Sequence, residues 1–419
     1  MRARSLLVAA ALAALPAHAL AAGAAKPAAP RAAPVTVAGA LAGAADLAAQ
    51  GAYGDAAALI RIALRFDSRG VPSGLDADTR FALALADALG GAGPAYPDRS
   101  SVVDGTLAAL AAGKPIPDAA WNAAGDELAM LCDLVAFAGH FDGEDVGRSL
   151  EASSGAPPAA GEGGLRRCLA QSVLPLVAGS VPAAAPLAAI VSPSDGTTLA
   201  AIARRFALEG RHDQAAALCA ALPDPAVRTA VSRSVVSARQ LSGLKLKDEQ
   251  LELALLQNWR YADGEAAEVF GQLFLSRASA ATLRGRRAAI VEALDRAKSP
   301  LLERAARLAL LEKLEPAEAG RLRPGEDQVP SRELLGFLAF APKGQALDRW
   351  AAELPRQKLS PRMRGIASYL LMRRVSGDKS EVTRKKLLGE ILAAARQDGG
   401  GDRVLVRLSS MALADAGRR

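Results

Sequence analysis

Apolar residues recur along most of the chain with the spacing of amphipathic helices. Leu283, Ile290, Leu294 and Ala297, for example, stand at intervals that place them on one helical face. No stretch of five or more residues alternates in strand fashion with enrichment in β-branched residues. The pattern therefore predicts an all-α protein built from antiparallel helix pairs.

Helix starts carry their own signals. Asp224, Ser299 and Ser360 each stand directly before a proline, and a capping side chain followed by proline is typical of a helix N-terminus. Charged pairs four residues apart are expected to support the helices on their solvent side. These pairs are Glu292 with Arg296, Glu303 with Arg307, and Glu381 with Lys385.

A short frame occurs twice: glycine, any residue, a ring, any residue, a polar residue, then Ala-Ala-Ala-Leu. The first copy contains Gly51, Tyr53 and Ala56, and the second contains Gly210, His212 and Ala215. We expect the glycine to end one helix, the ring to pack over the turn, and the alanines to let the next helix approach closely.

Around residues 41–68 and 199–227 this frame resembles the tetratricopeptide repeat, whose two antiparallel helices carry large and small residues at such offsets. The resemblance implies that the helix pairs stack as an α-solenoid, a fold whose extended concave surface binds peptides or protein helices.

The resemblance has departures. Leu199 and Ala203 stand where the repeat usually has tryptophan and glycine, and Trp259 and Tyr261 before Gly264 give only a looser echo. The two copies lie 159 residues apart, which is not a multiple of about 34 residues. No regular tandem array is therefore visible in the sequence.

The chain begins like an exported protein. Arg2 and Arg4 precede an apolar run from Leu6 to Leu15, and a small-residue cleavage pattern follows. The run is too short to cross a bilayer core of about 30 Å. We therefore expect a signal peptide over 1–21 that is cleaved. Abundant alanine and glycine, with arginine favoured over lysine, add the expectation of a bacterial, periplasmic protein.

Composition then predicts the domain organisation. Residues 22–40 are rich in Ala, Pro and Gly and predict a linker. Residues 1–200 hold 13 Lys and Arg against 18 Asp and Glu, whereas the rest of the chain holds 38 against 26. The charge changes sign near an uncharged stretch of the chain. Several prolines interrupt this stretch, and they argue against a membrane-spanning helix there. We expect an acidic helical domain over 41–178, an Ala/Pro connection over 179–194, and a basic helical-repeat domain over 195–419.

Candidate chemistry is scarce. Beyond the leader only His140 and His212 remain, and neither has a second histidine at the spacing of a zinc site. No P-loop, dinucleotide-binding glycine motif or nucleophile elbow occurs. A catalytic pair of Cys132 and His140 is disfavoured because the apolar helix around Cys132 would raise its pKa. The sequence predicts no catalytic residue, no metal site and no cofactor.

The three cysteines allow a disulfide in an oxidising compartment. Cys132 with Cys168 is one candidate pair and would leave Cys219 free or buried, although three cysteines fix no connectivity.

A basic cluster lies near the C-terminal end. Its candidate residues for binding an anionic partner are Arg362, Arg364, Arg373, Arg374, Arg384, Lys385 and Lys386. Aromatic residues for base stacking are nearly absent there, so nucleic acid is not expected. An anionic membrane surface, a cell-wall component or an acidic protein remains open, as does an ordinary solvated helix face.

The favoured function is a non-catalytic scaffold or protein-interaction protein of the bacterial envelope, with a protein or peptide partner. One alternative is an envelope or cell-wall-active enzyme, or its accessory subunit, whose carboxylates leave no sequence signature. Others are a periplasmic accessory protein of the flagellar-motor type, suggested only by broad outline, and a peripheral membrane binder that uses residues 362–386.

Overall fold

The computed structural model describes residues 36–67, 75–90, 101–141, 143–153, 164–177, 196–222, 224–326, 329–375, 380–397 and 399–418. Every regular element in these ranges is a helix, and no strand occurs in them, so the predicted all-α class is confirmed. The expected signal peptide lies outside the described ranges and stays a prediction. None of the described helices combines the length and the apolar character needed to cross a membrane.

The chain divides into two compact units. Unit 1 is Met1–Val71 with Ile391–Arg419, and unit 2 is Pro72–Glu390. The expected connection over 179–194 lies outside the described residues, and the helices before and after it both belong to unit 2. The units therefore do not follow the predicted acidic and basic domains, because helix packing rather than charge composition holds each unit together.

Unit 1 brings the two ends of the described chain together. Its helices are α2 (Val37–Ala49), α3 (Tyr53–Phe66), α25 (Arg403–Gly417) and the last residues of α24 (Ser380–Arg396). The first four residues of α2 fall inside the linker predicted over 22–40, so that linker ends earlier than expected. Helix α25 packs against α3, where the Ser410 hydroxyl donates to the Ala57 carbonyl at 3.3 Å.

The first part of unit 2 is a group of helices around α7. These helices are α4 (Ala77–Gly90), α5 (Ser101–Ala112), α6 (Asp118–Trp121), α7 (Gly125–Phe141), α8 (Gly143–Ser153), α9 (Gly164–Cys168), the π-helical turn η1 (Leu169–Val173) and α10 (Leu174–Val177). Helix α7 packs against α5, α8, α9 and η1, so it is the centre of this group.

The second part of unit 2 contains the longer series of helices. They are α12 (Gly196–Leu208), α13 (His212–Ala221), α14 (Pro225–Gly243), α15 (Asp248–Tyr261), α16 (Gly264–Arg277), α17 (Ala280–Gly285), α18 (Arg287–Ala297), α19 (Pro300–Lys313), α20 (Pro316–Ala319), α21 (Ser331–Phe340), α22 (Gln345–Glu353), the 3-10 turn η2 (Leu354–Arg356), α23 (Pro361–Arg374) and most of α24.

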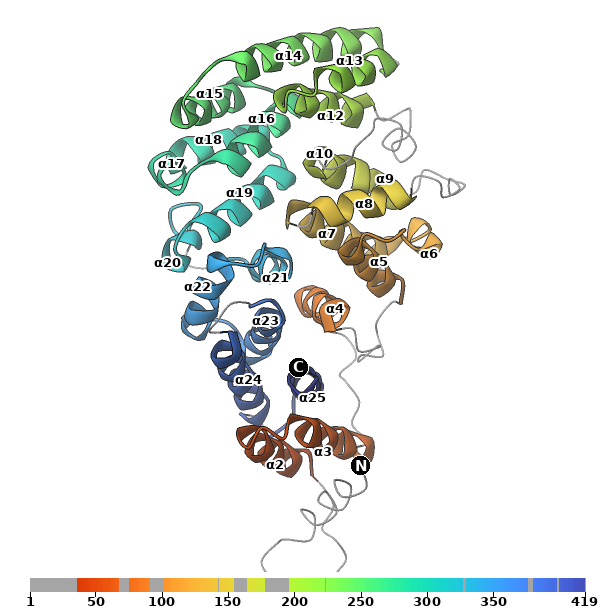
Figure 1. Cartoon of the computed structure of the whole chain (residues 1–419), viewed down its shortest axis with the longest axis vertical. Coiled ribbons are helices and arrows are strands. Elements are labelled where there is room, and N and C mark those ends of the chain that lie inside the picture. The colour runs from red at the N-terminus through yellow and green to blue at the C-terminus, as the bar shows by residue number, and fades with distance from the viewer. Residues whose placement is uncertain are drawn as a thin grey trace, which may run out of the picture. The chain divides into compact units, whose positions relative to one another are not determined.

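Five helices of this series, two to four positions apart in chain order, form one continuous row. In the row, α12 packs against α16, α16 against α19, α19 against α21, and α21 against α23 (Figure 1). The helices between them, such as α15 with α18 and α20 with α22, pack beside the row. The last two helices of the row contact the first part of unit 2, because α21 packs against α4 and α7 and α23 packs against α4.

The local signals of the sequence are confirmed at the helix starts. The side chains of Asp224, Ser299 and Ser360 accept hydrogen bonds from the first turns of α14, α19 and α23. The predicted pairs Glu303–Arg307 and Glu381–Lys385 form at 3.1 and 2.8 Å.

The prediction for Glu292 and Arg296 is wrong. Glu292 pairs with Arg260 of α15 at 2.7 Å, and Arg296 pairs with Asp263 in the connection between α15 and α16 at 3.6 Å. An exposed pair within one helix contributes only about 0.2–0.5 kcal/mol, so an adjacent helix easily provides a competing partner.

The apolar residues from Leu283 to Ala297 are buried as predicted, but they belong to two helices rather than one. Leu283, Ile290 and Leu294 are buried. The helix is interrupted at Arg286, which separates α17 from α18.

Candidate functional site

The repeated frame forms the same turn in both places. Gly51 and Gly210 have φ of +79° and +80°, in the left-handed region that favours glycine. The amide after each glycine, at Ala52 and Arg211, donates to the carbonyl five residues earlier, at 2.9 and 2.8 Å. Each glycine amide donates to the carbonyl three residues earlier. Together these bonds are the Schellman motif that ends a helix.

The side chains of the frame are positioned as expected in part. Ala56 and Ala215 are fully buried and allow the paired helices to approach closely. Tyr53 and His212 are half-buried and begin α3 and α13. The weaker match at Trp259, Tyr261 and Gly264 forms a different turn, because Gly264 begins α16 rather than ending α15.

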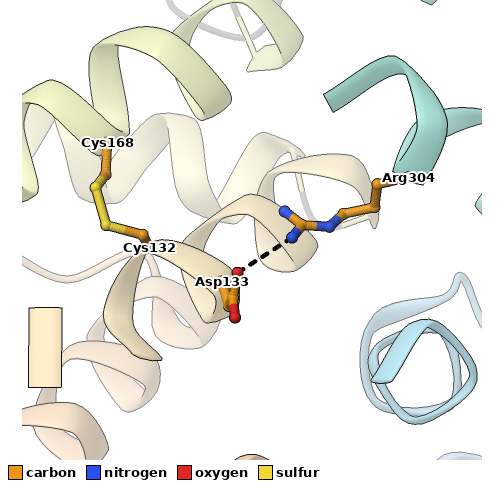
Figure 2. Close-up of a disulfide and its surroundings, with 4 residues drawn as sticks. All are labelled: Cys132, Asp133, Cys168 and Arg304. Atoms are coloured by element: carbon orange, nitrogen blue, oxygen red, sulfur yellow. Dashed lines mark hydrogen bonds and ion pairs between the residues drawn. A yellow bond between two sulfur atoms is a disulfide. The ribbon is translucent and has the colours of Figure 1, made fainter. Parts of the chain in front are cut away.

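Helix α7 is held on two sides by adjacent residues (Figure 2). Cys132 forms a disulfide with Cys168 at the end of α9, with the two Cα atoms 5.4 Å apart. Asp133 accepts from Arg304 of α19 at 3.1 Å and from Arg332 of α21 at 2.6 Å. Asp133 therefore joins α7 to residues that lie 171 and 199 positions later in the sequence. We call this part of unit 2, where α7 meets α9, α19 and α21, the α7 junction.

Aromatic side chains fill the interior of the α7 junction. The rings of Phe81 and Phe137 lie 5.6 Å apart, and those of Phe141 and Phe337 lie 5.8 Å apart. A Cβ added at Gly336 would overlap the ring of Phe137, so this glycine lets α21 approach α7. The junction is therefore an apolar contact with an ion-pair network at its edge.

A small surface pocket opens beside this network. It is lined by Arg80, Phe81, Asp126, Ala129, Met130, Asp133 and Arg332. Its two carboxylates already have cationic partners, since Asp126 lies 3.8 Å from Arg80 and Asp133 holds Arg332. The pocket therefore lacks the unpaired carboxylates that the enzyme hypothesis requires. Among the described residues, no group of three or more His, Cys, Asp or Glu could hold a metal ion.

The other groups of chemical interest have packed surroundings. His140 is half-buried near the end of α7, and its Nε2 atom is shielded from solvent without a hydrogen-bond partner. Burial, together with the charges of Arg304 and Arg205, lowers the pKa of His140 to about 3. Cys219 is a free buried thiol, and burial raises its pKa, which makes it a poor nucleophile.

The predicted anionic-partner surface lies on α23 and α24, and much of it is used inside the fold. Arg374 donates to the Ala341 carbonyl at the end of α21, and Arg384 donates to Val375 at the end of α23. Arg364 reaches the Gln357 carbonyl, and Lys385 pairs with Glu381. The remaining members of the predicted cluster are Arg362 and Arg373, which are half-buried, and Lys386, which is exposed.

Arg374 belongs to a series of cations that cap the C-terminal ends of earlier helices. Arg296 donates to Arg260, Lys313 to three carbonyls at the end of α16, and Arg349 to Glu312. The donor and acceptor of these bonds, and of the Arg374 bond, are 33 to 38 residues apart. A cation near a helix C-terminus stabilises its exposed carbonyls, and we call these four residues the capping cations.

The exposed cations that sequence reasoning missed lie on α14 and just after it. They are Arg233, Arg239, Lys245 and Lys247. The signal was present in the sequence, because no Asp or Glu occurs between Asp224 and Asp248. The charge of a whole half of the chain hides this segment, whereas the charge of each single helix reveals it.

No protein-family model, curated protein or solved structure matches this chain.

Proposed function

We propose that the chain is an exported, non-catalytic helical-repeat protein of the bacterial envelope that binds a protein or peptide partner. The observation that carries the proposal is the row α12, α16, α19, α21 and α23, together with the capping cations. Lys313 links α19 to α16 and Arg374 links α23 to α21, whereas Arg296 and Arg349 link α18 to α15 and α22 to α19. Each capping cation stands 33 to 38 residues after the carbonyl that it caps. This distance is close to the length of one tetratricopeptide-like helix pair, about 34 residues.

The repeated turn supports the same reading. Two helix pairs, α2–α3 and α12–α13, are closed by the same Schellman motif and the same buried alanine. Proteins built from stacked helix pairs bind their partners along extended surfaces rather than in deep pockets. The predicted export signal and the basic C-terminal half fit an envelope location, with a partner reached through surface contacts.

In-cell photo-crosslinking tests this proposal. A photoreactive amino acid is placed at three exposed apolar positions, Phe66 in unit 1 and Val236 and Val382 in unit 2, which are 78%, 54% and 73% exposed. We expect light-dependent adducts with a defined protein from at least one position, in the periplasmic fraction. Adducts at none of the three positions, or retention of the chain in the cytoplasm, would contradict the proposal.

A further inference from the structure

The segment from Pro225 to Lys247 carries charge of one sign only. It contains five cations and no acid. Arg228 is used inside the fold, because it donates to the Leu222 carbonyl at the end of α13. The other four, Arg233, Arg239, Lys245 and Lys247, are exposed, and their side chains make no hydrogen bond or ion pair within the described part of the chain.

Helix α14 also presents most of its surface to solvent. Only Val231 and Ala238 of its 19 residues are buried, where the helix packs against α12 and α13. A helix of this length normally buries a stripe at least 100° wide. Much of α14 is therefore left for another contact.

The cations of α14 are arranged around an apolar side chain. Arg233, Val236 and Arg239 are three residues apart, so the two arginines flank Val236 on one exposed face, about 9 Å apart along the helix axis. Val236 is 54% exposed. Thr229, Ser232 and Gln240 lie on the same face by helical spacing.

We propose that this face, which we call the α14 basic face (Arg233, Val236, Arg239, with Lys245 and Lys247), binds an acidic segment of a protein partner. The assignment rests on the proposed function and names the surface and the chemistry of that partner. Carboxylates of the segment pair with Arg233 and Arg239, and an apolar side chain between them covers Val236. Arginine suits this role because its planar guanidinium binds a carboxylate through two parallel hydrogen bonds.

A protein segment fits this face better than a lipid surface. Helices that lie in a membrane interface insert several leucine, phenylalanine or tryptophan side chains. In the segment from Pro225 to Lys247 the exposed large apolar residues are only Val236 and Leu244, and neither is aromatic. The Thr229 hydroxyl donates within its own helix, and the exposed Gln240 amide beside Val236 can hydrogen-bond to a peptide.

A binding assay with purified mature protein tests the assignment. One probe is a labelled synthetic peptide made of repeated Glu-Glu-Leu, and its control has Gln in place of Glu. The other probe is a phosphatidylglycerol vesicle. The double variant Arg233→Glu with Arg239→Glu removes the α14 basic face. The matched variant Lys343→Glu with Lys358→Glu makes the same change in net charge at two exposed lysines elsewhere in unit 2.

We expect the acidic peptide to bind, with affinity that falls as ionic strength rises. The α14 variant should weaken binding roughly tenfold or more, and the matched variant by less than about twofold. Equal loss in both variants would reduce the effect to net charge and overturn the assignment. Absence of peptide binding overturns it as well, and binding of vesicles without peptide would assign the face to lipid. Thermal melts of the variants check that each remains folded.

The crosslinking positions separate this inference from the proposed function. Adducts from Val236 that disappear in the α14 variant and persist in the matched variant support both. Adducts from Val382 or Phe66 with none from Val236 would leave the proposed function standing and overturn the inference.

Discussion

Two groups of arginines and lysines in unit 2 have similar composition and opposite surroundings. On α23 and α24, the guanidinium groups of Arg374 and Arg384 donate to carbonyls at the ends of α21 and α23. On α14, Arg233 and Arg239 extend into solvent and make no bond within the described chain. The difference depends on whether the C-terminal end of an earlier helix lies within reach.

This comparison teaches that a basic cluster in the sequence does not by itself indicate a binding surface. Helix C-termini carry partial negative charge and unpaired carbonyls, and a stack of helices provides many of them. Cations near such an end stabilise the fold, and only the remainder is available to a partner. Four measurements test this account of where the cations act and how the helices are held.

Lys313→Met should show the strongest effect. The Lys313 ammonium donates to the carbonyls of Leu275, Ser276 and Ala278 at 2.8 to 2.9 Å, and methionine would leave all three without this donor. We expect the free energy of unfolding to fall by about 2–4 kcal/mol, measured by urea denaturation. Lys245→Met, at an exposed lysine without such bonds, should change it by less than about 0.5 kcal/mol. Equal effects would break the contrast.

The next test uses pH. Burial and the charges of Arg304 and Arg205 hold the pKa of His140 at about 3 in the folded protein, against 6.5 for an ordinary histidine. The unfolded chain therefore binds a proton that the folded protein does not. This contribution to stability is complete above about pH 6.5 and is lost as pH falls toward 3.

Between pH 7 and pH 5 the wild type should lose about 2 kcal/mol more stability than His140→Gln. Denaturation midpoints at several pH values measure the difference. Parallel pH profiles for the two proteins would show that His140 is not held neutral by its surroundings.

Arg374→Ala should have an intermediate effect. The substitution removes the donor to the Ala341 carbonyl at the end of α21, and we expect a loss of about 1–2 kcal/mol. Arg239→Ala is the matched change on the α14 basic face and should stay within about 0.5 kcal/mol. A loss at Arg239 as large as that at Arg374 would mean that α14 cations also support the fold.

The smallest effect is expected at the two repeated turns, which should behave alike. Gly51 and Gly210 have the same positive φ, and a Cβ at either position would meet no atom within 4 Å. Alanine should therefore cost about 1 kcal/mol at each, from backbone conformation alone. Thermal unfolding of the two single variants should agree, and a large difference would show that the turns are not equivalent.

The parts of the fold that depend on neighbouring residues could be predicted from the sequence. The Schellman turns at Gly51 and Gly210 and the helix starts at Asp224, Ser299 and Ser360 follow from local backbone chemistry. The all-α class follows from alanine content and helical periodicity in the same way.

The contacts that hold unit 2 together could not be predicted, because they join distant segments. Asp133 meets Arg304 and Arg332 across 171 and 199 residues, and nothing near Asp133 in sequence marks it. The charge of Glu292 likewise gave no sign that Arg260, rather than Arg296, is its partner.

The regular spacing of the helix pairs is visible in the hydrogen bonds between capping cations and helix ends, and not in a repeated sequence. The capping cations reach carbonyls 33 to 38 residues earlier, although no 34-residue sequence repeat is visible there. Any cation of sufficient length can cap a helix end, so the spacing persists while the residues that occupy it differ.

Photo-crosslinking from Val236 in two double variants tests the distinction between internal and external cations most directly. With Arg374→Ala and Arg384→Ala, and at a temperature where the protein stays folded, adducts should persist at wild-type yield. With Arg233→Glu and Arg239→Glu, they should disappear while the melting temperature stays unchanged. The opposite pattern, with adducts lost on removal of the α23–α24 cations and retained without the α14 arginines, would contradict the account.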